Sequence, residues 1–424
     1  MAAALFVVAR KDAATQAPEG LSRRTFLAVA SVMLVSSIGS TGLMSVMPVI
    51  GREVGIADHL VAGVFSLSAL LWAVASPQWA RLSDRWGRKP LILLGLGGVV
   101  LSMLGCGAAV MAALNKALGP LAAFVMLLLL RSTYGLLGSA SATAGQAYVA
   151  DRTFGQGRVK ALSALTGSSN FGSILGPALA PFLIVWPLGL AGPLFGFGLL
   201  GCLTVIAVLL GVPSDRRASR TPARLARQVG HLGIWSDPRI RPFLVYGLVA
   251  ASMQAFNTYT LGFLVIDSLG GGPAAAQPAI GQIMVCGAVA GLIAQWGLIG
   301  VGGMRPRVML RLGALLAAVG NAVLLLDTSF SALLVCFFVI SLGYGLARSG
   351  YAAGAFLSAG HEDQAATAGA VSAITGASIA LPPILAALLY QLSPRFPAAI
   401  AAASMAGLLG YALMKRELRN VEAH

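Results

Sequence analysis

Two arginines fall inside long apolar runs, where a permanent positive charge is costly to place. Arg131 lies near the middle of the run 120–146, and Arg348 lies in the run 330–355. A charged side chain at the centre of a membrane costs at least ~2.5–3.5 kcal/mol, so Arg131 must face water, a protein partner or a ligand. Arg348 lies near one end of its run and could instead reach water along its own stem. The planar guanidinium binds carboxylates and phosphates through paired hydrogen bonds, so anion binding is the chemistry available here.

Polar residues accompany both arginines at helical spacing. Tyr134 lies on the helical face of Arg131, and Tyr344 and Tyr351 lie on the face of Arg348, so we interpret these faces as opposing walls of one cavity. Polar side chains in other runs face either a cavity or a neighbouring helix, and the sequence does not decide between the two. The candidate cavity residues are Arg131, Tyr134, Asn170, Gln254, Asn257, Tyr259, Tyr344, Arg348 and Tyr351.

Asp, Glu and His residues, unlike Arg131 and Arg348, lie outside the middle of the apolar runs. All 14 Asp and Glu residues fall between the apolar runs or at their ends, and the four His residues lie between runs or at the terminus. We therefore expect no titratable carboxylate or imidazole in the middle of a run. If a proton is a coupling ion, either an acid at the end of a run, such as Asp84, Asp151 or Asp267, or the substrate itself must carry it.

The sequence contains no pattern typical of an enzyme. The four Cys residues lie inside apolar runs without CxxC spacing, which is typical of packing residues. We find no nucleophile–base pair, metal-ligand cluster or cofactor-binding loop. We therefore expect no enzymatic activity, no cofactor and no metal.

The composition indicates a membrane protein. The chain has 424 residues, of which 57% are hydrophobic and 10% charged, whereas soluble proteins are about 25% charged. A membrane-spanning helix needs about 20 mostly apolar residues, and a large soluble α-helical domain would need polar helix faces that are absent here. We predict an all-α membrane protein with spans near 25–50, 60–80, 90–113, 120–146, 160–184, 189–212, 242–266, 278–300, 308–326, 330–355, 367–390 and 397–414.

Basic residues alternate along the chain between these spans. The net charge of +15 is compatible with nucleic-acid binding, but of the 29 Lys and Arg residues 24 fall on one side of the predicted membrane and only three on the other. The positive-inside rule places the basic side in the cytoplasm, so we expect an inner (plasma) membrane protein, without nucleic acid, with both termini cytoplasmic. The expected segments are a tail 1–24, a first bundle 25–212, a basic linker 213–241, a second bundle 242–414 and a tail 415–424.

The short loop 77–90 between the second and third spans, PQWARLSDRWGRKP, carries a specific motif. It resembles the G-x-x-x-D-R-x-G-R-K loop between helices two and three of the major facilitator superfamily, with Ala80 at the first Gly position. In that family the loop latches the two halves in the outward-facing state, and its acid meets the start of helix eleven. The resemblance assigns gating to Asp84, Arg85, Gly87, Arg88 and Lys89, and Asp151 closes helix four on the same side.

Weak internal repeats indicate two homologous halves. Tyr134-Gly135-Leu136 recurs as Tyr344-Gly345-Leu346, and two further matches occur at nearly the same offset, close to half the chain length. Parallel repeats of six helices, with the substrate site near mid-membrane between them, are the plan of the major facilitator family. We therefore predict twelve transmembrane helices in two pseudo-symmetric six-helix bundles, the major facilitator fold.

Two further matches point to the drug-efflux branch of that family. Arg131 with Gly135 resembles the helix-four signature R-x-x-x-G of drug–proton antiporters, and Gly172, Gly176 and Pro177 resemble the antiporter motif of helix five. Ala180 and Pro181 replace the final pair of glycines of that motif, so the match is partial. This motif marks exporters within the superfamily; general small-residue helix packing is the alternative.

The resemblance implies a monomeric secondary transporter that moves a small molecule across the bilayer by alternating access, and export, with a proton as candidate coupling ion, is the favoured direction. The first alternative is an anion or metabolite carrier in which Arg131 and Arg348 bind a carboxylate or phosphate. The second is a transporter-like receptor that senses its ligand without net transport.

Overall fold

The computed structural model describes residues 21–213, 232–295, 304–359 and 363–419. Most of the predicted N-terminal tail and basic linker, and the end of the C-terminal tail, lie outside these ranges. Within them the regular structure is entirely helical, which agrees with the predicted all-α class.

The first half of the chain forms one bundle of helices, here called the N-terminal bundle. The fourth predicted span is divided by a π-helical turn, and the fifth ends in a short 3-10 helix. Its elements are α2 (Arg23–Val54), α3 (Asp58–Trp86), α4 (Arg88–Leu114), α5 (Pro120–Thr133), η1 (Tyr134–Gly138), α6 (Ser139–Asp151), α7 (Gly155–Leu179), η2 (Ala180–Leu183), η3 (Gly189–Ala191) and α8 (Gly192–Gly211).

The second half forms the C-terminal bundle. Its eleventh predicted span is broken at Leu381, since Pro382 begins a new helix and cannot continue the preceding hydrogen-bond ladder. The elements are η5 (Leu232–Trp235), α9 (Arg241–Leu269), α10 (Pro273–Leu292), α11 (Pro306–Val323), α12 (Phe330–Ser358), α13 (Gln364–Ala380), α14 (Pro382–Leu392), α15 (Phe396–Met414) and α16 (Arg416–Arg419).

Eleven helical stretches of the described residues are long and apolar enough to cross a membrane. The predicted fifth span is not among them, although α7 is 25 residues long. Polar residues such as Ser168, Ser169 and Asn170 lower its hydropathy. α7 nevertheless packs along α2 inside the N-terminal bundle. The protein is therefore a multi-pass membrane protein whose polar fifth helix packs along α2.

Glycines permit the close contact between α2 and α7. A Cβ atom on Gly172 would lie 2.3 Å from the carbonyl oxygen of Leu34, and one on Gly176 would lie 2.5 Å from that of Ile38. Small residues are used in this way where two membrane helices approach closely. The predicted motif residues Gly172, Gly176 and Pro177 thus lie on α7, and both glycines face α2.

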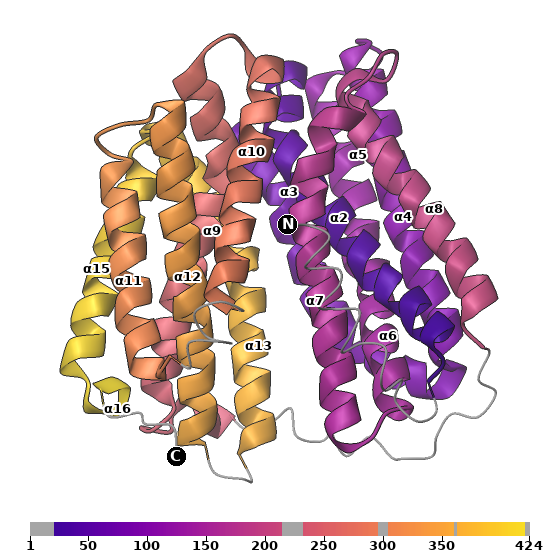
Figure 1. The fold of residues 1–424 in the computed structure, drawn as a ribbon. Helices are drawn as coiled ribbons and strands as arrows, with labels where there is room; N and C mark the ends of the chain where they lie inside the picture. The colour runs from indigo at the N-terminus through magenta and orange to yellow at the C-terminus, as the bar shows by residue number, and fades with distance from the viewer. Residues whose placement is uncertain (1–20, 214–231, 296–303, 360–362, 420–424) are drawn as a thin grey trace, which may run out of the picture.

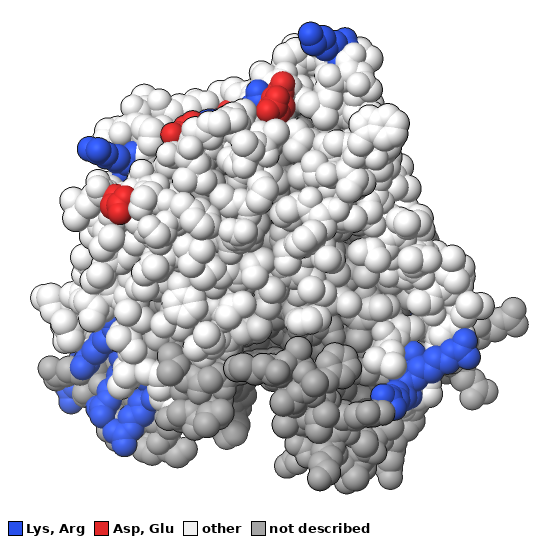
Figure 2. Space-filling model, turned by 45° about the horizontal axis from the view of Figure 1, so that its top comes forward, with Lys and Arg blue, Asp and Glu red and all other residues white. Residues whose placement is uncertain are grey.

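The two bundles stand side by side and meet along a limited set of helices (Figure 1). α3 contacts α13 and α14, and α10 contacts α2 and α7. On the face seen in Figure 2, Lys and Arg gather at the lower end of the molecule. A wide belt without charged residues separates them from the charged residues of the upper end. The junction of α3 and α4 lies at the lower end. We call these two ends the basic end and the opposite end.

Candidate functional site

Arg131 lies in the last turn of α5, beside the π-helical turn η1, and is 2% exposed. Its Nη2 donates a hydrogen bond to Oγ of Ser40 on α2 at 2.9 Å. Its guanidinium lies 3.9 Å from the ring centroid of Tyr134 and 5.5 Å from that of Phe65. Aromatic faces attract a cation placed at such distances. The charge is therefore enclosed by rings and one hydroxyl.

Part of the guanidinium has no hydrogen-bond partner. Nε and Nη1 of Arg131 are buried and find no acceptor among the described residues. An unpaired buried donor costs about 1–3 kcal/mol, and more for a charged group. A protein retains such donors when another molecule, a water or a ligand, completes them. Nε and Nη1 of Arg131 are therefore left to donate hydrogen bonds to an anion or a carbonyl oxygen while Nη2 keeps its bond to Ser40.

The aromatic residues around Arg131 connect the two bundles. Tyr134 packs on Trp72 with ring centroids 5.3 Å apart, and its hydroxyl donates to the Ser36 carbonyl at 3.4 Å. Phe65 meets Tyr259 of α9 edge-on at 5.7 Å. The candidate residues Arg131, Tyr134 and Tyr259 are thus brought together, and Tyr259 is the contribution of the C-terminal bundle.

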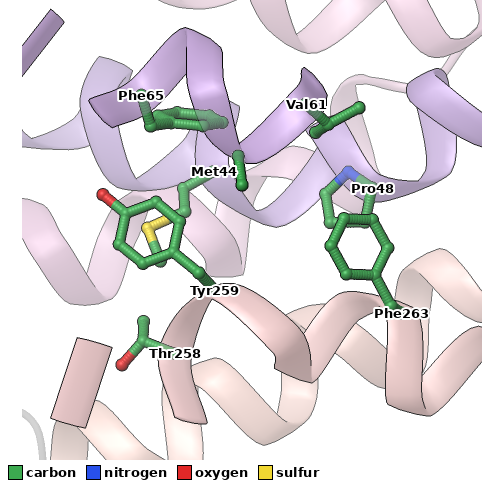
Figure 3. A pocket seen from close by; sticks show the side chains of 8 residues that line it. Met44, Pro48, Val61, Phe65, Thr258, Tyr259 and Phe263 are labelled. Atoms are coloured by element: carbon green, nitrogen blue, oxygen red, sulfur yellow. The ribbon is translucent and has the colours of Figure 1, made fainter. Parts of the chain in front are cut away.

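A small pocket lies beside Phe65 and Tyr259, which are part of its lining (Figure 3). Its walls come from α2 and α3 of one bundle and from α9 of the other. Sequence reasoning missed all of these residues except Tyr259, because ordinary apolar residues give no signal of a pocket. The lining consists of Met44, Pro48, Val61, Ala62, Phe65, Thr258, Tyr259 and Phe263.

The predicted opposite wall of the cavity is arranged differently from our expectation. Asn257 donates to Oδ1 of Asn321 at 2.6 Å and accepts from the Tyr344 hydroxyl at 2.8 Å. Tyr344 and Tyr351 are both 2% exposed, and Tyr351 packs against Gly247. In this conformation Asn257, Tyr344 and Tyr351 therefore pack within the C-terminal bundle and do not face Arg131.

The remaining candidates lie apart from one another. Arg348 is exposed on α12, and Gln254 is half-buried on α9. Asn170 of α7 donates to Oε1 of Gln295 at 3.4 Å, which joins the N-terminal bundle to the helical turn that follows α10 in the chain. Asn170 is thus at the junction of the bundles, as its predicted role requires, whereas Arg348 and Arg131 form no common site here.

At the basic end, three of the predicted gating residues, Asp84, Arg88 and Asp151, form an ion-pair cluster within the N-terminal bundle. Arg88 contacts Asp84 at 2.6 Å and Asp151 at 3.0 Å. Lys89 donates to the Leu209 carbonyl at 2.9 Å. Gly87 joins α3 to α4 with φ of 90°, a conformation that favours glycine. Arg85 is exposed.

The C-terminal bundle has its own charged group at the basic end. Arg239 contacts Asp237 at 2.7 Å and Asp363, which precedes α13, at 3.8 Å. The side-chain hydrogen bond from Arg239 holds the pKa of the half-buried Asp237 carboxyl below its usual value. Like the pairs of Arg88, these pairs join residues of a single bundle.

At the opposite end, an ion pair crosses from one bundle to the other. Arg52 of α2 contacts Asp58 of α3 at 2.9 Å and also pairs with Asp267 of α9. Asp267 accepts a further hydrogen bond from the Tyr390 hydroxyl of α14 at 2.6 Å. His59 and Gln391 form a second polar contact between α3 and α14. The sequence indicates each residue as the end of a span but gives no sign of the pairing.

Sequence comparison identifies the family. The sequence model of the Major Facilitator Superfamily matches residues 29–383, most of the chain. The chain belongs to the Major Facilitator Superfamily. Solved structures agree on the fold: the nucleoside transporter NupG aligns with a TM-score of 0.72 and 12% identity over 94% of this chain and 100% of its own. A bacterial homologue of the lysosomal transporter Spinster, inward-facing and occupied, aligns with a TM-score of 0.65 and 13% identity over 92% of this chain and 94% of its own.

Curated relatives match over part of this transporter. The class B tetracycline resistance protein of Escherichia coli is 30% identical over 42% of this chain and 41% of its own length. The multidrug resistance protein MdtG of Proteus mirabilis is 30% identical over 35% of each chain. The matches thus span less than half of these two relatives. Both relatives are resistance proteins by name.

Proposed function

We propose that this transporter exports a small molecule from the cytoplasm by alternating access. The observation that carries the proposal is the contrast between its ends: polar and ionic contacts cross between the bundles at the opposite end, through Arg52 and Asp267, whereas the pairs around Arg88 and Arg239 stay within one bundle. An arrangement closed at one end is what a carrier adopts when its site is accessible from the other.

The orientation in the membrane follows from charge. Lys and Arg gather at the basic end. The positive-inside rule assigns this end to the cytoplasm, and the distribution of Lys and Arg along the sequence assigns both chain termini to the same side. The closed end then faces outward, and the conformation described is inward-facing. The partial likeness to tetracycline and multidrug resistance proteins supports export and an inner-membrane location.

Gating at the basic end is proposed to depend on exchange of partners. Asp84 now pairs with Arg88, four residues along the chain. When the bundles close at this end, the family resemblance places the acid at the start of helix eleven, here α13, where backbone N–H groups favour a carboxylate. Arg88 would keep Asp151 as its partner. Asp84 therefore stabilises the outward-facing state more than the inward-facing one.

The substrate is proposed to be anionic or zwitterionic. Arg131 carries unpaired N–H groups, and the described residues include no acid paired with it. A fixed positive charge in a low-dielectric site attracts anions and repels cations. The unpaired N–H groups of Arg131 also favour the second candidate function, a carrier for an anionic metabolite. This carrier differs from the proposed exporter only in the direction of transport.

Transport by the purified protein in vesicles with an imposed pH gradient tests both the proposed direction of transport and the proposed charge of the substrate. We expect inside-out vesicles to accumulate an anionic or zwitterionic probe, and an acidic lumen to increase accumulation if a proton is exchanged. Accumulation only in right-side-out vesicles would contradict export and favour the metabolite carrier. A panel of anionic, neutral and cationic probes, from which only simple cations are moved, would contradict the role of Arg131.

A further inference from the structure

The pocket of Figure 3 lies between two guanidinium groups. Its Phe65 wall is 5.5 Å from the guanidinium carbon of Arg131, and its Phe263 wall is 5.5 Å from that of Arg52. Arg52 is paired with Asp58 and Asp267, whereas Arg131 retains unpaired donors. The ring of Phe65 therefore lies between the pocket lining and the site of an uncompensated positive charge.

The lining itself carries no charge and is rich in rings. Phe65, Tyr259 and Phe263 contribute aromatic faces and edges, and Met44 contributes a flexible thioether that packs well against rings. Thr258 and the Tyr259 phenol are its polar side chains. Such a surface favours a flat apolar group and offers little to a second charged group.

The division of the lining between bundles makes the pocket change with conformation. Met44, Pro48, Ala62 and Phe65 belong to the N-terminal bundle, and Thr258, Tyr259 and Phe263 to the C-terminal bundle. A Cβ on Gly262 would lie 2.3 Å from Pro48, so α9 and α2 are in close contact beside it. In the closed state the pocket is small, and separation of α9 from α2 and α3 at this end must enlarge it.

We propose that the transported anion carries an aromatic group, which this pocket receives while Arg131 holds the anionic end. This inference rests on the proposed function and narrows its substrate class to amphiphilic aromatic anions. The aromatic group occupies the pocket as the bundles part at the opposite end. Tyr259 then acts as a specificity residue, because its ring borders both the pocket and Phe65 beside Arg131.

Permanently charged sulfonates test the proposal without leaking through the bilayer. Uptake into inside-out vesicles is measured for naphthalene-2-sulfonate, for propane-1-sulfonate, which has the same charge without the ring, and for a naphthylmethyl-trimethylammonium cation. Burial of one aromatic group should lower the KM of the aromatic anion at least about tenfold relative to the aliphatic anion. Equal KM values for the two anions would overturn the proposal.

A substitution that fills the pocket can be compared with the same type of substitution outside the pocket. Ala62 lines the pocket and is 2% exposed, whereas Leu70 of the same helix is 48% exposed. Ala62→Phe should raise the KM of the aromatic anion about tenfold and leave the aliphatic anion unchanged, and Leu70→Phe should change neither. If Ala62→Phe does not fold, Met44→Ala should still raise the KM of the aromatic anion selectively. An equal change for both anions would overturn the subsite.

Failure of the subsite is distinguishable from failure of the proposed function. If both sulfonates are transported with the same KM, the aromatic subsite is wrong and an anion transporter remains. If only the naphthyl cation is transported, the anionic substrate class is wrong, and the subsite proposal falls with it.

Discussion

The buried polar group around Asn257 in the C-terminal bundle and the one around Arg131 in the N-terminal bundle differ in how far their hydrogen bonds are completed. In the C-terminal bundle Asn257, Asn321 and Tyr344 satisfy one another, and Asn321 also donates to the Ala317 carbonyl at 2.8 Å. In the N-terminal bundle Arg131 has one acceptor, Ser40, and two buried nitrogens without any among the described residues. A satisfied network stabilises a fold, whereas unpaired donors on a buried charge cost free energy, and we propose that Arg131 is retained because it binds the substrate.

The contrast is informative because the two regions are related by the internal repeat. Tyr134 and Tyr344 occupy equivalent repeat positions, yet Tyr134 packs under a guanidinium and Tyr344 donates to an amide. Equivalent positions in two related bundles have therefore taken different tasks. We infer that the C-terminal bundle supplies a rigid frame here and the N-terminal bundle supplies the charge that recognises the substrate.

The largest expected effect is on stability in the C-terminal bundle. Asn257→Ala leaves the side-chain oxygen Oδ1 of Asn321 and the Tyr344 hydroxyl without their hydrogen-bond partner. The free energy of unfolding should therefore fall by about 2–4 kcal/mol. Thermal unfolding in detergent measures it, with Thr258→Ala on the same helix as the control. Transport per folded molecule should persist; a stable Asn257→Ala protein without transport would assign Asn257 to the substrate site.

A smaller effect is expected from the single partner of Arg131. Ser40→Ala removes the acceptor of Nη2 and loosens the guanidinium, so the KM for an anionic substrate should rise about tenfold, as expected for loss of one hydrogen bond to a charged group. Ser45, which is buried and bonds to the Gly42 carbonyl of its own helix, provides the control Ser45→Ala. Equal KM values for these two variants would show that Ser40 does not position Arg131.

The contacts that join the two bundles should have a moderate effect on conformation. Arg52→Gln removes the ion pair to Asp267, so opening at the opposite end should become about fivefold more frequent, which corresponds to about 1 kcal/mol. The measurement is the rate at which an impermeant maleimide labels Val61→Cys in a protein without native cysteines. Arg395→Gln alters an exposed arginine as the control. An unchanged labelling rate would refute the proposed closure by Arg52.

The smallest effect is expected at the basic end. The pair of Asp84 with Arg88 is partly exposed and spaced i,i+4, so its loss should change the free energy of unfolding by only about 0.5 kcal/mol. Asp84→Asn should nevertheless slow transport about threefold, because the acid is proposed to act in the other conformation. Vesicle uptake is compared with that of Glu417→Gln, an exposed acid near the C-terminus. Identical rates would remove Asp84 from the gating mechanism.

Much of this arrangement was predictable from the sequence, and the reasons are local. Span lengths and apolar runs located the helices, and the cost of burying Arg131 within an apolar run predicted that it faces water, a protein partner or a ligand. The loop motif identified Asp84 and Arg88, whose pairing depends on a spacing of four residues along one helix-to-helix turn. Such features depend on residues that are near each other in the chain.

The features that escaped prediction depend on neighbours distant in sequence. Helical spacing places Tyr344 and Arg348 near one another on α12 but does not say which helix faces each, and Tyr344 faces Asn257 instead of Arg131. Arg52 and Asp267 are separated by 215 positions. Their pairing follows only from the way the two bundles meet.

The most direct test of this account replaces Arg131 itself and measures uptake of an anionic and a cationic probe into inside-out vesicles. Arg131→Ala should lower anion transport at least about 100-fold, since it removes more than one charged hydrogen bond, while thermal unfolding stays close to that of the parent protein. Arg131→Lys should restore only part of the activity, because lysine keeps the charge without the planar pair of donors. If the parent protein transports aromatic cations well and Arg131→Ala leaves that transport unchanged, Arg131 is a structural residue and the account is wrong.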